Sequence, residues 1–160
     1  MKISNSMMTG ISFGLTSAAI TTLGLMVGLN STTHSQLVVL GGVLTIAIAD
    51  ALSDSLGIHI SEESKKDNEK TDVWEATFAT FGSKLIFGLT FAIPVILLDL
   101  DLAMIVSVLW GLFALSILSF YIARRNKENP LHVIAEHIGI AVFVILVTNF
   151  LGEWIGTTFG

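Results

Sequence analysis

Residues 102–123 read LAMIVSVLWGLFALSILSFYIA, a run without a single charged side chain. A helix of about 20 mostly apolar residues is long enough to cross the hydrocarbon core of a bilayer. The run does not alternate apolar and polar residues, as the strands of a membrane β-barrel do. Because a helix satisfies its own backbone hydrogen bonds in lipid, the sequence predicts a membrane-spanning helix here.

The composition of the whole chain favours lipid as its solvent. Hydrophobic residues make up 52% of the 160 residues and charged residues 13%, whereas a soluble domain carries about 25% charged residues. The mean hydropathy is +0.79. The chain has no cysteine, which excludes disulfides and thiolate metal sites. A net charge of −5 gives no reason to expect a nucleic-acid partner.

Four further stretches are long and apolar enough to span. We therefore predict an all-α, polytopic membrane protein, a single domain over residues 1–160 with a short charged connector at 61–74. Asn129 before Pro130 fits a helix N-cap followed by proline at the first helical position, which marks the start of the last span. The five predicted spans cover residues 7–29, 37–60, 75–98, 102–123 and 130–151.

The positive charges predict how the chain is oriented. Seven of the eight lysines and arginines lie in the N-terminal tail and in the connectors between spans two and three and between spans four and five. An odd number of spans puts these three segments on one side, and segments rich in lysine and arginine stay in the cytoplasm. The N-terminus is therefore predicted to be cytoplasmic and the C-terminus outside. The seven residues are Lys2, Lys65, Lys66, Lys70, Arg124, Arg125 and Lys127.

The eighth positive residue, Lys84, falls about ten residues into the third span. A charge at the centre of a bilayer is costly unless it reaches the interface or pairs with an opposite charge. Two interpretations remain open. Either the third helix begins as a cytoplasmic amphipathic stretch and Lys84 lies near the interface, or Lys84 pairs with an acid inside the membrane.

Glycines recur at four-residue spacing in the first span, as Gly10 and Gly14 and again as Gly24 and Gly28. Small residues at this spacing let membrane helices approach closely. The pattern predicts close helix packing, either within the chain or in a dimer.

Asp50 and Asp54 are the main candidates for chemistry inside the membrane. Residues four apart share a helix face, about 6 Å apart along the axis. Two such carboxylates stay ionised only beside a cation or a water-filled pathway, and otherwise one takes up a proton. Their oxygens, with Ser53 beside them, suit ions such as Mg²⁺, Mn²⁺ and Fe²⁺. The alternative is that both acids lie at the headgroup level and are simply solvated.

Two other groups could bind or attract metal ions. His59, Glu62 and Glu63 follow the aspartates and could form an acidic mouth that concentrates cations; a solvated helix end is the alternative. His132 and Glu136 are four apart at the start of the last span, a spacing compatible with joint metal binding. There the alternative is a pair of ordinary interfacial residues.

Catalytic motifs are missing from the sequence. No glycine-rich phosphate loop follows a strand, and no set of serine, histidine and acid is evident. Intramembrane aspartyl proteolysis needs two acids on different helices, whereas Asp50 and Asp54 share one. We therefore expect no enzyme activity.

Several stretches together resemble the vacuolar iron transporter family, in their order along almost the whole chain. They are GISFGLTSAAITTLGLMVGL (10–29), ADALSDSLGIHISEES (49–64), FATFGSKLIFGLTFAIPVILL (78–98) and TNFLGEWIG (148–156). The resemblance implies a five-helix homodimer that exports Fe²⁺ or Mn²⁺ from the cytosol in exchange for protons. It also implies a metal site inside the membrane along the dimer axis.

The metal-binding residues of the family are rearranged in this chain. Phe13 stands where the family has an aspartate of the first helix, Asp54 where it has a methionine, and Ile58 where it has a glutamate. The connector 61–74 is also too short to contain the long metal-binding insert of the plant-type members. Asp50 and Asp54 remain as the candidate ligands inside the membrane.

Together with the paired aspartates, the resemblance thus implies a proton-coupled transporter of Fe²⁺ or Mn²⁺ that works in a lipid bilayer, as a homodimer and without a permanently bound cofactor. The expected location is the cell membrane of a prokaryote or the vacuolar or another organelle membrane of a eukaryote. The competing hypotheses are a non-transporting membrane assembly or sensor protein on the same scaffold, and a transporter of another cation or a small solute.

Overall fold

The computed structural model describes residues 4–65 and 68–160. They form helices α1 (Asn5–Thr33), α2 (Gln36–Glu63), α3 (Lys70–Thr90), α4 (Ala92–Leu97), α5 (Leu100–Asn126) and α6 (Pro130–Phe159). Taking α3 and α4 together as the span Lys70–Leu97, the described chain has five helices long and apolar enough to cross a membrane. The predicted all-α, five-span fold is confirmed.

The break between α3 and α4 has a local cause. Pro94 has no backbone N–H, so it cannot bond to the carbonyl of Thr90, and its ring crowds that carbonyl. The chain tightens here, where the backbone N–H of Phe91 donates to Gly88 O at 3.2 Å. The result is a span whose helix is interrupted at Phe91.

The last helix begins where the sequence predicts. Asn129 is the N-cap of α6, and its side chain accepts a hydrogen bond from the backbone N–H of Leu131. Pro130 follows at the start of the helix, where its missing N–H costs nothing. The helix then continues to Phe159, beyond the predicted end at residue 151.

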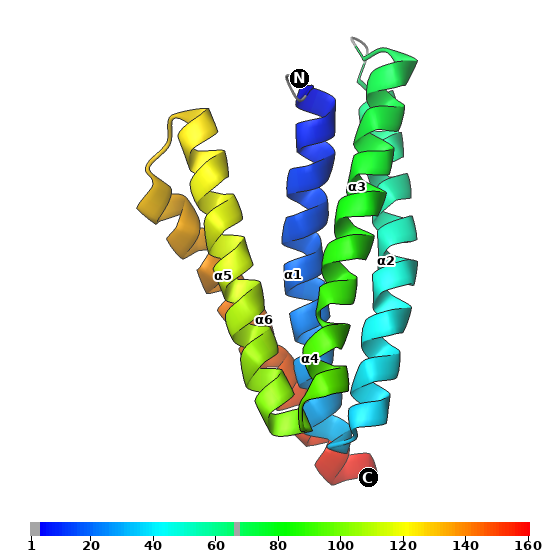
Figure 1. Cartoon of the computed structure of the whole chain (residues 1–160), viewed down its shortest axis with the longest axis vertical. Helices are drawn as coiled ribbons and strands as arrows, with labels where there is room; N and C mark the ends of the chain where they lie inside the picture. Colours follow the sequence, from blue (N-terminus) through cyan, green and yellow to red (C-terminus); the bar gives the residue numbers. More distant parts are fainter. Residues whose placement is uncertain (1–3, 66–67) are drawn as a thin grey trace.

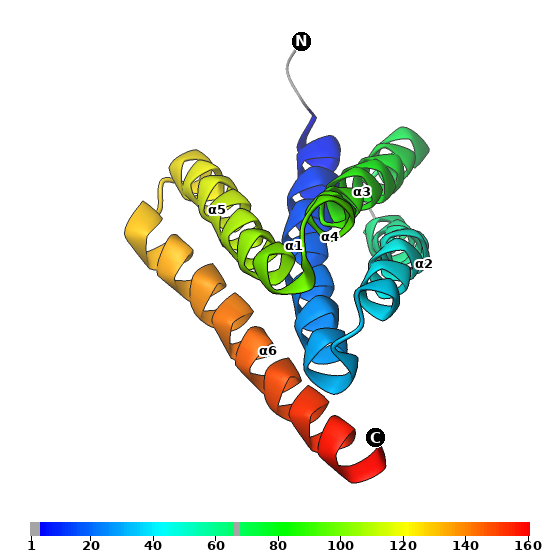
Figure 2. The same ribbon diagram turned by 60° about the horizontal axis from the view of Figure 1, so that its bottom comes forward.

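Helix α1 lies at the centre of the molecule. It packs against α2 and α3 on one side and against α5 and α6 on the other (Figures 1 and 2). An apolar core joins α1 to α2, α4 and α5, with Leu23, Met26, Val43, Val95 and Met104 among its buried members. Helices α2 and α3, which carry Asp50, Asp54 and Lys84, are both packed against α1.

The chain ends lie at opposite ends of the bundle, and the connectors α2–α3 and α5–α6 lie at the N-terminal end (Figure 1). This arrangement puts the described connector charges on one side, as the charge pattern requires. Their cytoplasmic location stays a prediction. Of the seven positive residues, Lys2 and Lys66 lie outside the described residues. The other five are Lys65, Lys70, Arg124, Arg125 and Lys127.

The four glycines of α1 contact other helices of the same chain. A Cβ added at Gly10 would lie 2.4 Å from Ala76 O of α3, and one at Gly24 would lie 2.8 Å from Val144 Cγ1 of α6. Both distances are shorter than ordinary contacts; at Gly10 the near atom belongs to the backbone, so a side chain there would push α3 away, whereas at Gly24 the side chain of Val144 would have to shift. Of the two interpretations of the pattern, the structure thus supports close packing within the chain.

Candidate functional site

Lys84 is buried in the middle of the bundle and pairs with both aspartates. Its side chain is only 2% exposed, and its Nζ lies 2.6 Å from Asp50 Oδ2. The same Nζ forms an ion pair with Asp54 Oδ2 and donates a hydrogen bond to Ser17 Oγ at 2.7 Å. The structure therefore supports pairing inside the membrane and not a position of Lys84 near the interface.

Small residues on α3 bring Lys84 into this position. The buried face of α3 is formed by Val73, Ala76, Thr80, Lys84 and Gly88. On the opposing helix, a Cβ at Gly14 would lie 2.8 Å from Thr80 O. The backbones of α1 and α3 are thus close enough for the long lysine side chain to extend between them toward α2.

Two hydroxyl groups of α1 complete the cluster. Ser17 Oγ donates to Asp54 Oδ2 at 2.7 Å, while accepting from Lys84. The hydroxyl of Thr21 is shared between Asp50 Oδ2 at 2.8 Å and Ser17 O at 2.9 Å. Reasoning from the sequence missed both hydroxyls. Their signal is position, since Ser17 and Thr21 continue the face of α1 that carries the closely packed glycines.

The cluster lies halfway along the helices. Asp50 is near the middle of the 28-residue helix α2, and Lys84 is near the middle of the 28-residue span Lys70–Leu97. At a rise of 1.5 Å per residue, each lies about 20 Å from both ends of its helix. Ionisable groups at this depth are expensive to keep, which makes them candidates for function.

The cluster carries one excess negative charge when all three groups are ionised. It is closed on the lysine side and more open on the acid side, where the side chains of Asp50 and Asp54 are 24% and 22% exposed. Among the described residues, hydrogen bonds and ion pairs reach only the Oδ2 atom of each carboxylate. The Oδ1 atoms are therefore available to a proton or a cation.

The described residues 4–65 and 68–160 contain no group of three or more histidine, cysteine, aspartate or glutamate side chains placed to hold a metal ion. The carboxylates that the described residues place at the centre are those of Asp50 and Asp54. Its other oxygens come from hydroxyls, a set that suits hard or borderline cations.

Glu62 lies at the end of α2, where both oxygens of its carboxylate are paired with neighbouring side chains. Its side chain is 5% exposed and forms an ion pair with Lys65 Nζ at 2.6 Å. The other oxygen accepts from Asn68 Nδ2 at 2.6 Å. Glu62 lies about 12 Å along the helix from Asp54, so the structure does not bring it into the central cluster.

Its neighbours His59 and Glu63 face a different environment. Both line a pocket of about 350 Å³ between α2 and α3, together with Lys70 and Trp74. His59 Nδ1 lies 3.0 Å from Thr77 Oγ1, and its ring packs edge-on against Trp74. The residues of the predicted acidic mouth therefore do not share one site: Glu62 is buried against Lys65 and Asn68, whereas Glu63 is exposed to solvent.

His132 and Glu136 are exposed on the first turns of α6. This helix packs against α1 and α5, whereas the paired aspartates lie on α2. The next residue, His137, turns inward and its Nδ1 lies 2.8 Å from Ser119 Oγ. The structure places the His132–Glu136 pair apart from the central cluster, at the N-terminal end of the bundle (Figure 1).

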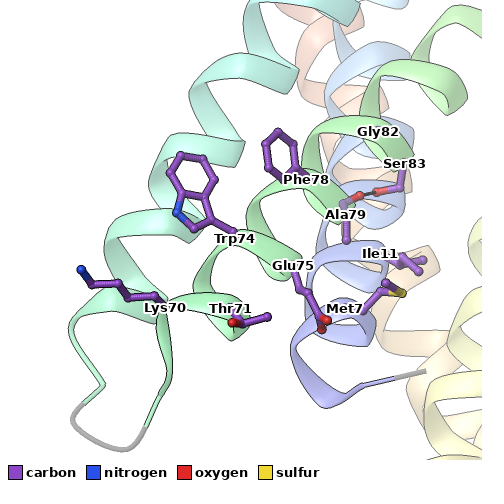
Figure 3. A pocket seen from close by; sticks show the side chains of 10 residues that line it. All are labelled: Met7, Ile11, Lys70, Thr71, Trp74, Glu75, Phe78, Ala79, Gly82 and Ser83. Carbon is purple, nitrogen blue, oxygen red and sulfur yellow. Dashed lines mark hydrogen bonds between the residues drawn. The ribbon is translucent and has the colours of Figure 1, made fainter. Parts of the chain in front are cut away.

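A groove of about 900 Å³ lies between α1 and α3, near the N-terminal end. Met7 of α1 lies opposite Glu75 of α3 there, and Phe78 contributes to the wall (Figure 3). Glu75 Oε2 accepts a hydrogen bond from Ser4 Oγ at 2.5 Å. The wall is mostly apolar, and neither aspartate of the central cluster lines it.

A comparison of the chain with protein-family models finds no match, and a comparison with curated proteins finds none either. The resemblance to vacuolar iron transporters stays a hypothesis based on the order of the motifs quoted above. The function must therefore be argued from the cluster itself.

Proposed function

We propose that the protein is a membrane transporter for a divalent cation, Mn²⁺ or Fe²⁺, coupled to protons and directed out of the cytosol. The observation that carries this proposal is the cluster of Asp50, Asp54 and Lys84 halfway along the spans. In this proposal Asp50 and Asp54 bind the cation when the cation is present. When the cation is absent, a proton compensates the excess negative charge of the cluster.

The number of charges argues against a purely structural ion pair. One acid is enough to neutralise a buried lysine, and a second adds a negative charge that is costly at this depth. The Oδ1 atoms of Asp50 and Asp54 also have no hydrogen-bond or ion-pair partner among the described residues, and they belong to side chains that are 24% and 22% exposed. An exchangeable proton or cation accounts for both features.

The ligand chemistry supports a cation that prefers oxygen. The groups at the centre are carboxylates and the hydroxyls of Ser17 and Thr21. The direction of transport follows from the predicted orientation and from the family resemblance. Glu63, His132 and Glu136 are exposed at the end of the bundle predicted to be cytoplasmic, where acidic side chains raise the local concentration of cations.

A second copy of the chain is the cover that we propose for the open side of the cluster. Half-open carboxylates cannot face lipid at this depth without a large cost. An apolar groove of about 600 Å³ between α1, α2 and α6 has Thr21 in its wall, so it reaches the same region. We propose a homodimer that covers this side. The mass of the protein in detergent, measured by light scattering, checks this.

The transport assay uses proteoliposomes loaded with a Mn²⁺-sensitive dye and a pH gradient. Asp50→Asn and Asp54→Asn should each lower the rate about tenfold or more, because losing an interaction with a charged group costs about 1.5–3 kcal/mol. Asp101→Asn, the same change at an exposed acid in the first turn of α5, should keep the wild-type rate. Full Mn²⁺ transport by both site variants would refute the assignment.

One observation favours a second candidate function. The pairing of Lys84 with α2 and its bond to α1 tie three helices together, as expected of a non-transporting assembly or sensor protein. In that case wild-type vesicles would carry no Mn²⁺, and Asp50→Asn would lower thermal stability without any change in flux.

A further inference from the structure

We propose that Lys84 is a tethered cation whose ammonium group competes with the cargo ion for the carboxylates of Asp50 and Asp54. This inference rests on the proposed transport function and adds a residue that sets affinity and release. It follows from the surroundings of the lysine.

The Nζ atom of Lys84 has the coordination expected of a bound cation. Three oxygens surround it: Asp50 Oδ2 at 2.6 Å, Ser17 Oγ at 2.7 Å and the paired Asp54 Oδ2. An ammonium group has three N–H donors, and each has an acceptor here. A cation that used both Oδ2 atoms would have to take the place of Nζ.

The ammonium group of Lys84 and the cargo ion reach the carboxylates from different sides. Lys84 extends from the buried side, with 2% of its side chain exposed, whereas the carboxylates are open on the other side. Two positive charges in contact repel strongly in a low-dielectric interior. A cargo ion that approaches from the open side therefore competes with the ammonium for the shared oxygens.

Competition also explains how the site could release its cargo. Two carboxylates without a counterion would hold a divalent ion tightly, and a tightly held ion leaves slowly. The ammonium of Lys84 cannot diffuse away, so it returns to the carboxylates when the ion moves off. Lys84 then weakens binding and speeds release.

A lysine that only holds helices together predicts the opposite result. Its removal would leave Asp50 and Asp54 without a partner, loosen the contact of α3 with α2, and weaken any binding at the site. The two roles therefore differ in the sign of the change in affinity.

The test compares Lys84→Gln with wild type and with Lys127→Gln, which removes the same charge at the exposed end of α5. Mn²⁺ binding is measured by electron paramagnetic resonance on the purified protein in lipid nanodiscs. We expect Lys84→Gln to bind Mn²⁺ about tenfold tighter or more, and Lys127→Gln to match the wild type. In proteoliposomes, both KM and the maximal rate should fall for Lys84→Gln.

A second pair of variants tests the same point if Lys84→Gln alone folds poorly. The double variant Lys84→Gln with Asp54→Asn has the same formal charge at the centre as the wild type, and should bind Mn²⁺ tighter than Asp54→Asn alone. If the wild-type protein transports Mn²⁺ but the lysine variants bind Mn²⁺ no tighter than the proteins that keep Lys84, the role of Lys84 is overturned and the transport function is left intact. Tight binding by Lys84→Gln without wild-type transport overturns the function and supports Lys84. Loss of both overturns both.

Discussion

The contact between α1 and α3 can be tested with a single methyl group at Gly10. A Cβ there would lie 2.4 Å from Ala76 O and 2.8 Å from Ala79 Cβ, and ordinary contacts begin at 3.4 Å. The atom at 2.4 Å belongs to the backbone and cannot rotate away. In a closely packed interior, α1 must therefore move away from α3 by about 1 Å to accommodate alanine.

The expected cost follows from this overlap. Adding a methyl group to a well-packed interface costs about 1–3 kcal/mol, while replacing glycine by alanine within a helix gains about 1 kcal/mol. Gly28→Ala is the matched control, because a Cβ at Gly28 would lie at an ordinary 3.6 Å from Thr148 O. Both variants carry the same helix-propensity gain, so the difference between them isolates the contact at Gly10.

The assay is thermal unfolding of each variant in detergent. The fraction of protein that still elutes as a monodisperse peak is measured after heating to each temperature, and its midpoint is compared between variants. In a chain of this size, each kcal/mol changes the midpoint by about 2–4 °C, so Gly10→Ala should melt about 2–12 °C below Gly28→Ala. Gly10→Ala should also slow Mn²⁺ flux, because α3 carries Lys84. Equal midpoints for the two variants would show that α1 and α3 are not this close.

Two further predictions concern one hydroxyl of the cluster and the orientation of the chain. Ser17→Ala removes one of the two donors to Asp54 and should lower the free energy of unfolding by about 1–3 kcal/mol. Ser116→Ala, whose hydroxyl bonds only to Leu112 O, should have little effect, and equal losses for the two variants would contradict the central role of Ser17. Since the chain has no cysteine, Ser35→Cys and Lys127→Cys can each be labelled with a membrane-impermeant maleimide. In intact cells we expect labelling at 35 and not at 127, and the reverse result would invert the predicted orientation.

The spans could be predicted from the sequence because each one is a long apolar run, and lipid leaves the backbone few alternatives to a helix. The helix ends were less predictable. Helix α6 continues to Phe159 through glycine, threonine and tryptophan residues that hydropathy alone does not assign to a span. Capping residues located the ends better, as at Asn129.

The position of Lys84 could have been inferred from its helix face. Counting back from Lys84 by four, eight and eleven residues gives Thr80, Ala76 and Val73, all small or medium-sized and all buried. The large side chains Trp74, Phe78 and Ile86 occupy the other faces and are exposed. In a membrane bundle, large apolar residues face lipid and small residues face neighbouring helices, so this pattern places Lys84 inside the protein.

The same argument applied to α1 explains why the cluster forms on these helices. Gly10, Gly14, Ser17 and Thr21 follow one face at spacings of four, three and four residues. The glycines allow α3 to approach, and the hydroxyl of Ser17 then meets the lysine that α3 carries, while the hydroxyl of Thr21 meets Asp50 of α2. Small residues and polar residues thus share a face because both need a neighbouring helix, the first to fill space and the second to satisfy hydrogen bonds. Which carboxylate oxygen each donor reaches depends on side-chain rotamers, which no spacing in the sequence encodes.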